Sequence, residues 1–477
     1  SWNCSEFSWW RFEVEFEDKA AAYKPRLEAL QSKLAADGVE FIEIHTVDTS
    51  GAFRSKIAPL KLSTYGESIN AILYCVTHGD GQPMGDVAFA SPSANEDNGF
   101  PNIKGIIDPA TVVQHGWKPK FASAITSSYM LDGAVCPFDP RGVLARVEER
   151  ARALGYEPMI ALEYEFGIFH ADHDLMRAGR YRELKPWGHS LINYDLVRSG
   201  EYQDFAAEFI TRMKSIGIGV ASLVTEYGYG MYEYALTPKS ALQAADDAMR
   251  AKLHLRELCA ERGLVATFMT RFQPPGKESA CGAHHHVSLW RDGKPAFAAG
   301  PNRLTPVAEK FLAGVLHRMQ ETHLLFRPTV NSYRRFDRGA WSPEDVAWGF
   351  ENRTAPVRAI TTPNDGACRL EHRAPGADIN PYLSIAAILA AGCEGIEKDL
   401  PLEAPVTSNL ANLDKPKLPR TLNSSIEAFA ASDFCADAFG EAFRDNYAES
   451  RRAEQAAFDA WQASHITDFE WQRYFVS

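Results

Sequence analysis

Acidic side chains that could hold a cation alternate along the segment 159–169. Side chains of a β-strand point to opposite faces in turn, so Glu163 and Glu165 share one face of the predicted strand. The apolar Leu162 and Tyr164 occupy the other face. If the acidic face is open to water, the two carboxylates are an ordinary solvated strand edge. If it is enclosed, the like charges repel each other and require a cation between them.

The segment 282–290 repeats this arrangement with imidazoles. His284, His286 and Ser288 fall on one face of a second predicted strand. Neutral imidazole is the commonest nitrogen ligand for metals, although a packed or surface-exposed histidine triplet is an equally open interpretation. The segment is therefore a candidate metal-binding strand.

Arginines and further acids occur in two other segments. Arg369, Glu371 and Arg373 alternate on one side of a third predicted strand. Guanidinium groups suit phosphate and carboxylate oxygens, while a salt-bridged strand edge is the alternative interpretation. Glu226 and Glu233 flank a loop punctuated by glycines and aromatic residues, a pattern that is weak by itself.

Together these segments predict one polar cavity, because several strands with an apolar opposite face are hard to explain as independent exposed edges. Carboxylate and imidazole groups suit Mg²⁺ or Mn²⁺, and the arginines suit a substrate or transition state rich in negative charge. The sequence has no phosphate-loop pattern and no complete dinucleotide fingerprint, so a nucleotide site would require another fold.

Composition limits the kind of protein that carries this cavity. With 477 residues, 45% hydrophobic and 23% charged, the chain is long enough for several domains and is neither disordered nor fibrous. A net charge of −12 opposes attraction to nucleic acid or to an anionic membrane. Eight cysteines without a Cys-x-x-Cys pair indicate a cytoplasmic protein, and we expect neither a secretion signal nor a membrane span.

The elements that must position these residues can be predicted in outline. A helix over 19–36 precedes a strand over 39–48, which places Asp48 at a strand end beside a turn. An N-cap aspartate followed by proline begins a helix at Asp139, and we place a domain boundary just before it. Strands and helices then alternate in a large mixed region, and the tail from Ser424 is mainly helical.

In this order along the chain, the motifs resemble those of the glutamine synthetase superfamily, over most of its length. The resemblance implies an α+β fold with an N-terminal β-grasp domain, residues 1–138, and a catalytic domain, residues 139–477, whose antiparallel strands form a half-barrel. It also implies a ring of subunits, usually a double-ringed dodecamer, with active sites between neighbours. The matching stretches are Asp48-Thr-Ser-Gly, Glu163-Tyr-Glu165, Glu226 through Glu233, Gly282-Ala-His284-His-His286-Val-Ser288, Asn331-Ser-Tyr-Arg-Arg335, Glu351-Asn-Arg353-Thr, and Arg369-Leu-Glu371-His-Arg373 followed by Asn380-Pro-Tyr.

The resemblance also implies two divalent ions, Mg²⁺ or Mn²⁺, in each active site. One ion would lie near the substrate glutamate, and the other would bridge the phosphates of ATP. The six implied ligands are all present, namely Glu165, Glu226 and Glu233 for the first ion and Glu163, His284 and Glu371 for the second.

The implied reaction begins with phosphoryl transfer from ATP to the γ-carboxylate of L-glutamate, after which an amine attacks the acyl phosphate. Asp48 would reach in from the adjacent subunit and deprotonate the amine as general base. The basic and hydroxyl residues are assigned by their match to the family motifs. Arg335 would bind substrate glutamate, and Arg353 and Arg373 would neutralise the phosphoryl group and the γ-carboxylate. The residues implied on the nucleotide side are His286, Ser288, Arg358 and Arg369.

One departure from the family pattern concerns the second substrate. Ammonia-using relatives carry a glutamate in the loop after the Asn-Ser-Tyr motif, and Trp341 stands at that position here. Tryptophan can pack against an organic group or contact a cation through its ring, but it cannot supply the lost negative charge. We therefore expect a ligase that joins glutamate to an organic amine, apolar or aromatic such as aniline.

Several alternatives stay open at this point. The amine could be a polyamine, ethanolamine or an alkylamine. It could also be ammonia, if Trp341 only anchors its loop against the core and Glu344 or Asp345 supplies the charge. A catalytically silent relative is the third class, but such a protein should lose ligands that this chain keeps. Ser279-Ala280 replaces the Asn-Gly pair that helps relatives bind glutamate, so recognition of the α-amino group is also open.

Overall fold

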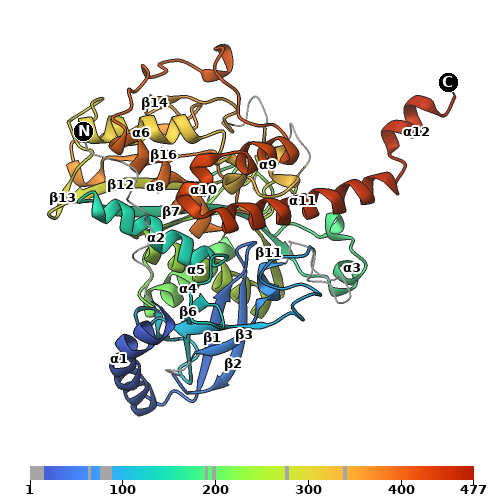
Figure 1. Cartoon of the computed structure of the whole chain (residues 1–477). Helices are drawn as coiled ribbons and strands as arrows, with labels where there is room; N and C mark the ends of the chain where they lie inside the picture. The colour runs from blue at the N-terminus through green and yellow to red at the C-terminus, as the bar shows by residue number, and fades with distance from the viewer. Residues whose placement is uncertain are drawn as a thin grey trace.

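The computed structural model describes residues 15–62, 66–75, 89–188, 192–195, 200–273, 279–336 and 341–476. A small N-terminal sheet with one long helix forms the lower part of the molecule in Figure 1, and a larger sheet surrounded by helices forms the upper part. The α+β class predicted from the sequence is confirmed.

The smaller sheet, which matches the expected β-grasp region, has the strand order β2-β1-β6-β4-β3, with β5 paired to β6. Strand β1, between β2 and β6, is antiparallel to β2 and parallel to β6. Helix α1 covers one face, and Leu27 and Leu34 of this helix share a small core with Ile42. The elements are α1 (Phe16–Ala36), β1 (Phe41–Val47), β2 (Phe53–Pro59), β3 (Glu67–Asn70), β4 (Asn102–Ile107), β5 (Val113–Gln114) and β6 (Phe121–Tyr129).

The larger sheet has the order β14-β15-β16-β12-β7-β9-β8, with β10 and β11 beside β7 and β13 beside β12. All its strand pairs are antiparallel except β14 with β15. All three strands predicted to carry charged residues are present, as β7, β12 and β16. The strands are β7 (Glu157–His170), β8 (Val220–Thr225), β9 (Met231–Leu236), β10 (Lys239–Ser240), β11 (Leu264–Thr267), β12 (Ala283–Arg291), β13 (Lys294–Pro295), β14 (Trp348–Phe350), β15 (Val357–Ile360) and β16 (Arg369–His372).

Helices pack on the apolar face of this sheet around the buried helix α8. A Cβ atom added to Gly314 of α6 would lie 2.0 Å from the carbonyl oxygen of Ala391 in α8, so these two helices touch through their backbones. No helix within the described ranges is both long and apolar enough to span a membrane. The helices are α2 (Pro140–Ala153), α3 (His173–Arg177), α4 (Gly200–Ser215), α5 (Ala241–Glu261), α6 (Pro306–Arg318), α7 (His323–Phe326), α8 (Pro381–Glu397), α9 (Leu422–Ala430), α10 (Asp433–Phe439), α11 (Glu441–Ala463) and α12 (Asp468–Tyr474).

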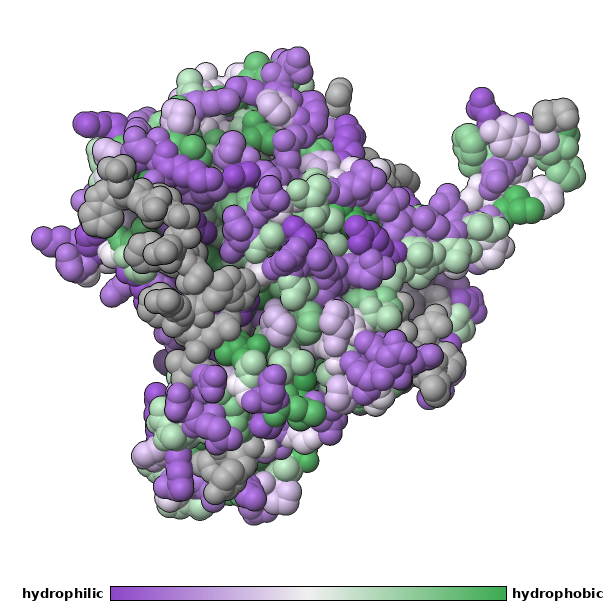
Figure 2. Space-filling model, in the orientation of Figure 1, coloured by the Kyte–Doolittle hydropathy of each residue, from purple (hydrophilic) through white to green (hydrophobic). Residues whose placement is uncertain are grey.

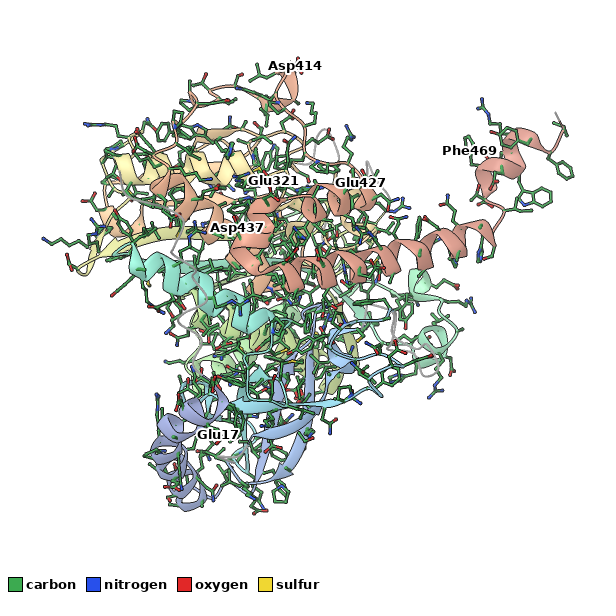
Figure 3. All side chains as sticks on the ribbon, in the orientation of Figure 1. Glu17, Glu321, Asp414, Glu427, Asp437 and Phe469 are labelled. Atoms are coloured by element: carbon green, nitrogen blue, oxygen red, sulfur yellow. The ribbon has the colours of Figure 1, made fainter. Side chains whose placement is uncertain are left out.

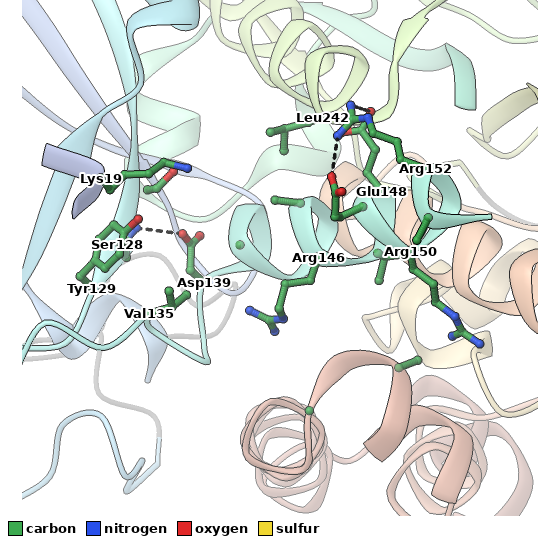
Figure 4. A pocket seen from close by; sticks show the side chains of 18 of the residues that line it. Lys19, Ser128, Tyr129, Val135, Asp139, Arg146, Glu148, Arg150, Arg152 and Leu242 are labelled. Carbon is green, nitrogen blue, oxygen red and sulfur yellow. Dashed lines mark hydrogen bonds and ion pairs between the residues drawn. The ribbon is translucent and has the colours of Figure 1, made fainter. Parts of the chain in front are cut away.

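Helix α2 joins the two sheets. Its N-cap Asp139 accepts hydrogen bonds from the backbone NH of Arg141 and, at 3.0 Å, from that of Ser128 in β6 (Figure 4). The buried Arg141 side chain donates to Asp246 on α5 and to Asp108 after β4. A cavity of about 430 Å³ beside α2 is lined by none of the predicted site residues. The predicted boundary falls at the N-cap of α2, and the division into two domains stays a prediction.

The C-terminal arm, residues 461–476, extends away from the body. Helix α11 starts against the body, where Phe443, Tyr447 and Arg451 are buried, and then leaves it (Figure 1). Phe469 on α12 lies far from the rest of the molecule (Figure 3), and both apolar and polar side chains of the arm are visible in Figure 2. The helical tail predicted from the sequence is confirmed, but its projection was not predicted.

Candidate active site

The predicted site residues meet on one face of the larger sheet, where β16, β12, β7 and β9 lie side by side. His284 of β12 lies opposite Glu163 of β7 in the antiparallel register, and His286 lies opposite Glu371 of β16. The opposite face is packed into the hydrophobic core, as the alternation of residues predicts. The sheet therefore brings together segments that are far apart in the sequence.

Glu163, His284 and Glu371 form the first cluster. One ligand atom from each residue lies within 4.8 Å of the other two. His284 Nδ1 is 3.4 Å from Glu163 Oε2 and 3.6 Å from Glu371 Oε1. The structure thus brings together the three residues that the resemblance assigns to one metal ion.

The second cluster contains Glu165, Glu233 and again His284, with ligand atoms within 4.8 Å of one another. Glu165 lies opposite Glu233 in the pairing of β7 with β9. The resemblance places Glu226 with these two carboxylates, but it lies outside the cluster. The Glu165 charge nevertheless acts on Glu226, and the side chain of Glu226 accepts a hydrogen bond from the backbone NH of Tyr227. Glu226 therefore borders the cluster.

The electrostatics of this face fit a divalent cation. Burial, together with the charges of Glu163 and Glu165, raises the pKa of Glu233 to about 9. Burial and the Glu165 charge raise the pKa of Glu226 to about 7. Nε2 of His284 is buried and has no hydrogen-bond partner among the described residues. Crowded carboxylates and an unpaired imidazole nitrogen are the donor set that Mg²⁺ or Mn²⁺ would neutralise.

His286 connects an arginine to one carboxylate of the first cluster. Arg369 Nε donates to His286 Nδ1 at 3.0 Å. Since the guanidinium can only donate, Nδ1 is the acceptor and a ring proton lies on Nε2, which is 2.9 Å from Glu163 Oε1. Burial alone would raise the pKa of Glu163, but His284 and His286 outweigh it and lower that pKa strongly. Glu163 is therefore an ionised carboxylate in a fixed position.

Two arginines fix Glu371. Arg373 forms an ion pair with one carboxylate oxygen, and Arg358 Nη1 lies 3.1 Å from the other. Burial would raise the pKa of Glu371, but the charges of Arg373, His284 and His286 lower it to about 2. Glu371 is therefore ionised throughout the physiological range, and both predicted arginines lie next to the first cluster.

The other predicted basic and hydroxyl residues lie around the same face. Arg335 is buried and its Nη1 donates to the backbone carbonyl of Arg373 at 2.9 Å. Arg353 is exposed, and its positive charge acts on Glu226. The hydroxyl of Ser288, in the second half of β12, accepts a hydrogen bond from the Trp290 ring NH at 3.1 Å.

Asp48 is engaged outside the two clusters. Its carboxylate accepts hydrogen bonds from Arg54 Nε and from the backbone NH of Ala52, both at 2.9 Å. The side chain is fully buried, and burial raises its pKa against the opposing effect of these two partners. The structure of one chain therefore leaves the expected role of Asp48 in a neighbouring site a prediction.

Trp341 is 53% exposed and therefore does not anchor its loop in the core. It borders a small cavity shared with Glu344 and Asp345. Glu344 is paired with Arg420 at 3.1 Å, and Asp345 forms an ion pair with Lys417. Both nearby carboxylates are therefore already neutralised within the chain. The loop residues 337–340 lie outside the described residues.

Gly282 begins the matching histidine stretch, but no role follows for it from the sequence, and the structure makes it a functional candidate. A Cβ atom at this position would lie 2.4 Å from Arg335 Nη2 and 2.9 Å from His284 Nε2. The Gly282 backbone NH also donates to the Glu165 carboxylate. Its place directly before the histidine strand was the available signal, but the sequence does not show how closely Arg335 approaches.

Replacing Gly282 with alanine is expected to lower kcat/KM for glutamate by about tenfold to hundredfold, because the added methyl group must displace Arg335 or His284. The matched control is Gly293→Ala, where a Cβ would contact nothing within 4 Å, although its positive φ makes some strain expected. Steady-state kinetics and thermal unfolding of both variants separate the two effects. Normal kinetics in Gly282→Ala would contradict the assignment of Arg335.

Comparison with known proteins agrees with this geometry. Residues 137–474 match the family model "Glutamine synthetase, catalytic domain". A glutamate–isopropylamine ligase from a Pseudomonas species is 32% identical over 451 residues, covering 90% of this chain and 97% of the relative. The γ-glutamylethanolamide synthetase GlnA4 of Streptomyces coelicolor is 33% identical over 380 residues, covering 80% of each chain. A solved structure described as a GmaS/ADP complex superimposes with a TM-score of 0.79 and 27% identity, over 94% of this chain and 99% of that one. This chain therefore belongs to the glutamine synthetase family.

Proposed function

We propose that this glutamate–amine ligase joins the γ-carboxyl group of L-glutamate to an organic amine, using ATP and a γ-glutamyl phosphate intermediate. The observation that carries the choice of amine over ammonia is the state of the acids beside Trp341. Glu344 and Asp345 are paired with Arg420 and Lys417, so neither offers a free negative charge to an ammonium ion.

The exposed ring of Trp341 supports an amine with a compact apolar group, either aryl, as in aniline, or alkyl. An exposed indole face can pack against such a group, and its π system attracts a cationic ammonium. The two relatives whose names specify isopropylamine and a γ-glutamylethanolamide product support a small organic amine in general.

The chain's own residues would divide the chemistry as follows. Glu165, Glu226 and Glu233 would hold one divalent ion, and Glu163, His284 and Glu371 a second. Two bound Mg²⁺ or Mn²⁺ ions would neutralise the charge of the ATP phosphates. Arg335 would bind the glutamate, while Arg353 and Arg373 would stabilise charge on the phosphoryl group and the γ-carboxylate. His286, Ser288, Arg358 and Arg369 would contact the nucleotide.

Asp48 would act from a neighbouring subunit of a ring, with a dodecamer as the proposed assembly. It would remove the proton that makes an ammonium form unreactive, since only a neutral amine can attack the acyl phosphate. Its raised pKa suits this task. The seven cysteines within the described ranges are unpaired, which supports the cytoplasmic location proposed from the sequence.

The test is phosphate release from the purified enzyme with Mg²⁺, ATP and L-glutamate, in parallel with ammonium, aniline, isopropylamine, ethanolamine and putrescine. Mass spectrometry of the amide products confirms coupling. We expect turnover with aniline or isopropylamine to exceed that with ammonium by about tenfold or more. Best turnover with ammonium would return the protein to glutamine synthesis, and no turnover at all would indicate a silent relative.

Replacing Trp341 with glutamate is expected to invert this preference. The change removes the apolar face and adds a negative charge, so kcat/KM for the organic amine should fall about tenfold and that for ammonium should rise. Leu131→Glu, a similarly exposed apolar residue of the N-terminal region, is the control and should alter neither value. An unchanged ratio of the two substrates in the Trp341 variant would show that the amine binds elsewhere.

Deleting residues 464–477, which removes all but the first three residues of the C-terminal arm, is expected to weaken or abolish the proposed double-ringed assembly. The arm exposes Ile466, Phe469, Trp471 and Phe475, each more than half accessible, on an element that touches little of its own chain. Such an apolar surface is stabilised by burial against another subunit. Size-exclusion chromatography with light scattering should show a smaller particle, whereas an unchanged mass would remove the arm from the interface.

A further inference from the structure

The segment 376–380, between β16 and α8, contains polar residues that the proposed reaction does not use. It runs alongside the start of β12: Gly376 bridges Gly282, and the backbone NH of Ala377 donates to the Cys281 carbonyl. Two of its side chains, Asp378 and Asn380, make hydrogen bonds in two different directions. Each reaches an element that carries a residue of the proposed reaction.

Asp378 gathers three hydroxyl groups. Thr270 Oγ1 donates to one carboxylate oxygen at 2.6 Å. Thr329 Oγ1 and Ser332 Oγ donate to the other at 2.6 and 2.7 Å. Thr270 and Ser332 are fully buried. Hydrogen bonds to a carboxylate are stronger than those between neutral groups, so Asp378 holds two segments, one at Thr270 and one at residues 329–332, against its own.

The elements fixed by Asp378 carry the glutamate side of the site. Ser332 belongs to the short helix η6 (Asn331–Arg335), which ends at Arg335. Thr270 is bonded through its carbonyl to the backbone NH of Cys281, next to Gly282. Gly282 and Arg335 approach each other so closely that a single methyl group would not fit between them. The position of Arg335 therefore depends on the Asp378 cluster.

Asn380 holds the turn that contains Asp48. Its Nδ2 donates to the carbonyl oxygens of Asp48 at 3.3 Å and Thr49 at 3.4 Å. Gly51, at φ +79, packs so tightly on it that a Cβ there would lie 2.8 Å from Asn380 Cα. Asn380 Oδ1 independently caps α8 by accepting from the backbone NH of Tyr382 at 3.1 Å. The amide thus connects the end of β1 to the start of α8.

From these contacts we propose that the segment 376–380 positions residues for both steps of the reaction. Asp378 holds Arg335 in the place where it would bind glutamate. Asn380 holds the turn that carries Asp48 in the place where Asp48 would remove the amine proton. Both are positioning residues, since neither touches the reacting atoms. The inference rests on the proposed function, because Asp48 has a proton to remove only if an amine attacks the acyl phosphate.

Two substitutions separate these roles. Asp378→Asn keeps the shape of the side chain but removes the charge that orders the three hydroxyl groups. Asn380→Asp keeps the acceptor that caps α8 and replaces the two donated hydrogen bonds with a carboxylate facing two carbonyl oxygens. Asn380→Ser also keeps a capping oxygen and loses both donors without adding charge, so it serves if the aspartate variant does not fold.

The experiment uses the full-length enzyme with Mg²⁺ and ATP and measures two steps. Single-turnover ADP formation with glutamate alone reports the first half, and steady-state amide formation with isopropylamine, ethanolamine or ammonium reports the second. Asp378→Asn should raise the KM for glutamate about tenfold without changing the KM for ATP. The Asn380 variants should keep normal ADP formation and lose about tenfold to hundredfold in amide formation with the cationic amine.

Hydroxylamine provides the decisive comparison, because it is neutral at the assay pH and needs no base. The Asn380 defect should disappear with hydroxylamine, a rescue that general damage to the fold would not produce. Matched controls are Asp172→Asn, an exposed N-cap that accepts through a single carboxylate oxygen, and Asn70→Asp, each of which preserves a capping acceptor elsewhere. Both should behave as the parent enzyme.

The outcomes distinguish the two levels of inference. Absence of glutamate-dependent ADP formation in the unmodified enzyme would overturn the proposed function itself. An active parent with variants that lose both steps equally, or neither, would overturn only the positioning roles. An Asn380 defect that persists with hydroxylamine would overturn the link between Asn380 and Asp48. A parent enzyme that uses no cationic amine would overturn the same link.

Discussion

Replacing Glu371 with glutamine is expected to lower kcat by about a thousandfold or more while the protein remains folded. Glu371 belongs to the first cluster and is also the partner of Arg373 and Arg358. The neutral amide loses one ligand of the proposed metal ion and releases two guanidinium groups from fixed positions. Steady-state kinetics across a Mg²⁺ titration should show both a lower kcat and a weaker dependence on metal.

The matched control for this experiment is Glu351→Gln. Glu351 also pairs with Arg358 but is exposed and belongs to neither cluster. An exposed ion pair contributes little, so we expect a change of less than about fivefold in kcat. Equal losses in the two variants would show that Arg358, and not the proposed metal site, dominates the effect of Glu371. Retained activity in Glu371→Gln would remove it from the metal ligands.

Replacing Arg141 with methionine is expected to lower the free energy of unfolding by about 3–5 kcal/mol. Arg141 is buried, with Nε and Nη2 donating to the two carboxylate oxygens of Asp246 at 3.0 and 2.9 Å and Nη2 donating to Asp108 at 2.8 Å. Methionine fills the space but leaves the carboxylates of Asp246 and Asp108 without the cation that donates hydrogen bonds to both. Urea denaturation at pH 7 measures the loss, which should also loosen the N-terminal sheet from α2 and α5.

The pH dependence of this loss follows from Asp108. Burial would raise the pKa of Asp108, but Arg141 outweighs burial and lowers it. An acid whose pKa is lower in the folded state stabilises the fold at pH values above its unfolded-state pKa of about 3.9. This stabilisation is lost as the pH falls through the folded-state pKa. The difference between parent and variant should therefore be largest at pH 7 and shrink below about pH 4.

Arg150→Met on the same helix is the control for Arg141. Arg150 pairs with Glu397 near the surface, and we expect a loss of about 1 kcal/mol or less. A similar cost at both positions would mean that the buried network is no more important than a surface pair. A variant of Arg141 that unfolds with the parent's midpoint would contradict the proposed junction between the sheets.

The sequence alone determined the strands that carry the site and the family to which the chain belongs. Alternation with period two is a local property, so the shared face of Glu163 and Glu165, and that of His284 and His286, could be read from neighbouring residues. The N-cap and proline at Asp139 identify a helix start by the same local logic. The succession of such segments predicted a large mixed region of strands and helices, and the α+β class followed from the family resemblance.

Only the tertiary structure decided how these segments meet and which charges are left unpaired. The sequence does not give strand register, which places His284 in both clusters and leaves Glu226 at their border. It also does not show that the acids near Trp341 are neutralised by residues about 70 positions away. Hydrogen bonds such as that from Asn380 to the Asp48 turn, 332 residues apart, depend on chain packing as a whole. Periodicity acts over a few residues, whereas pairing and burial are set by contacts distant in sequence.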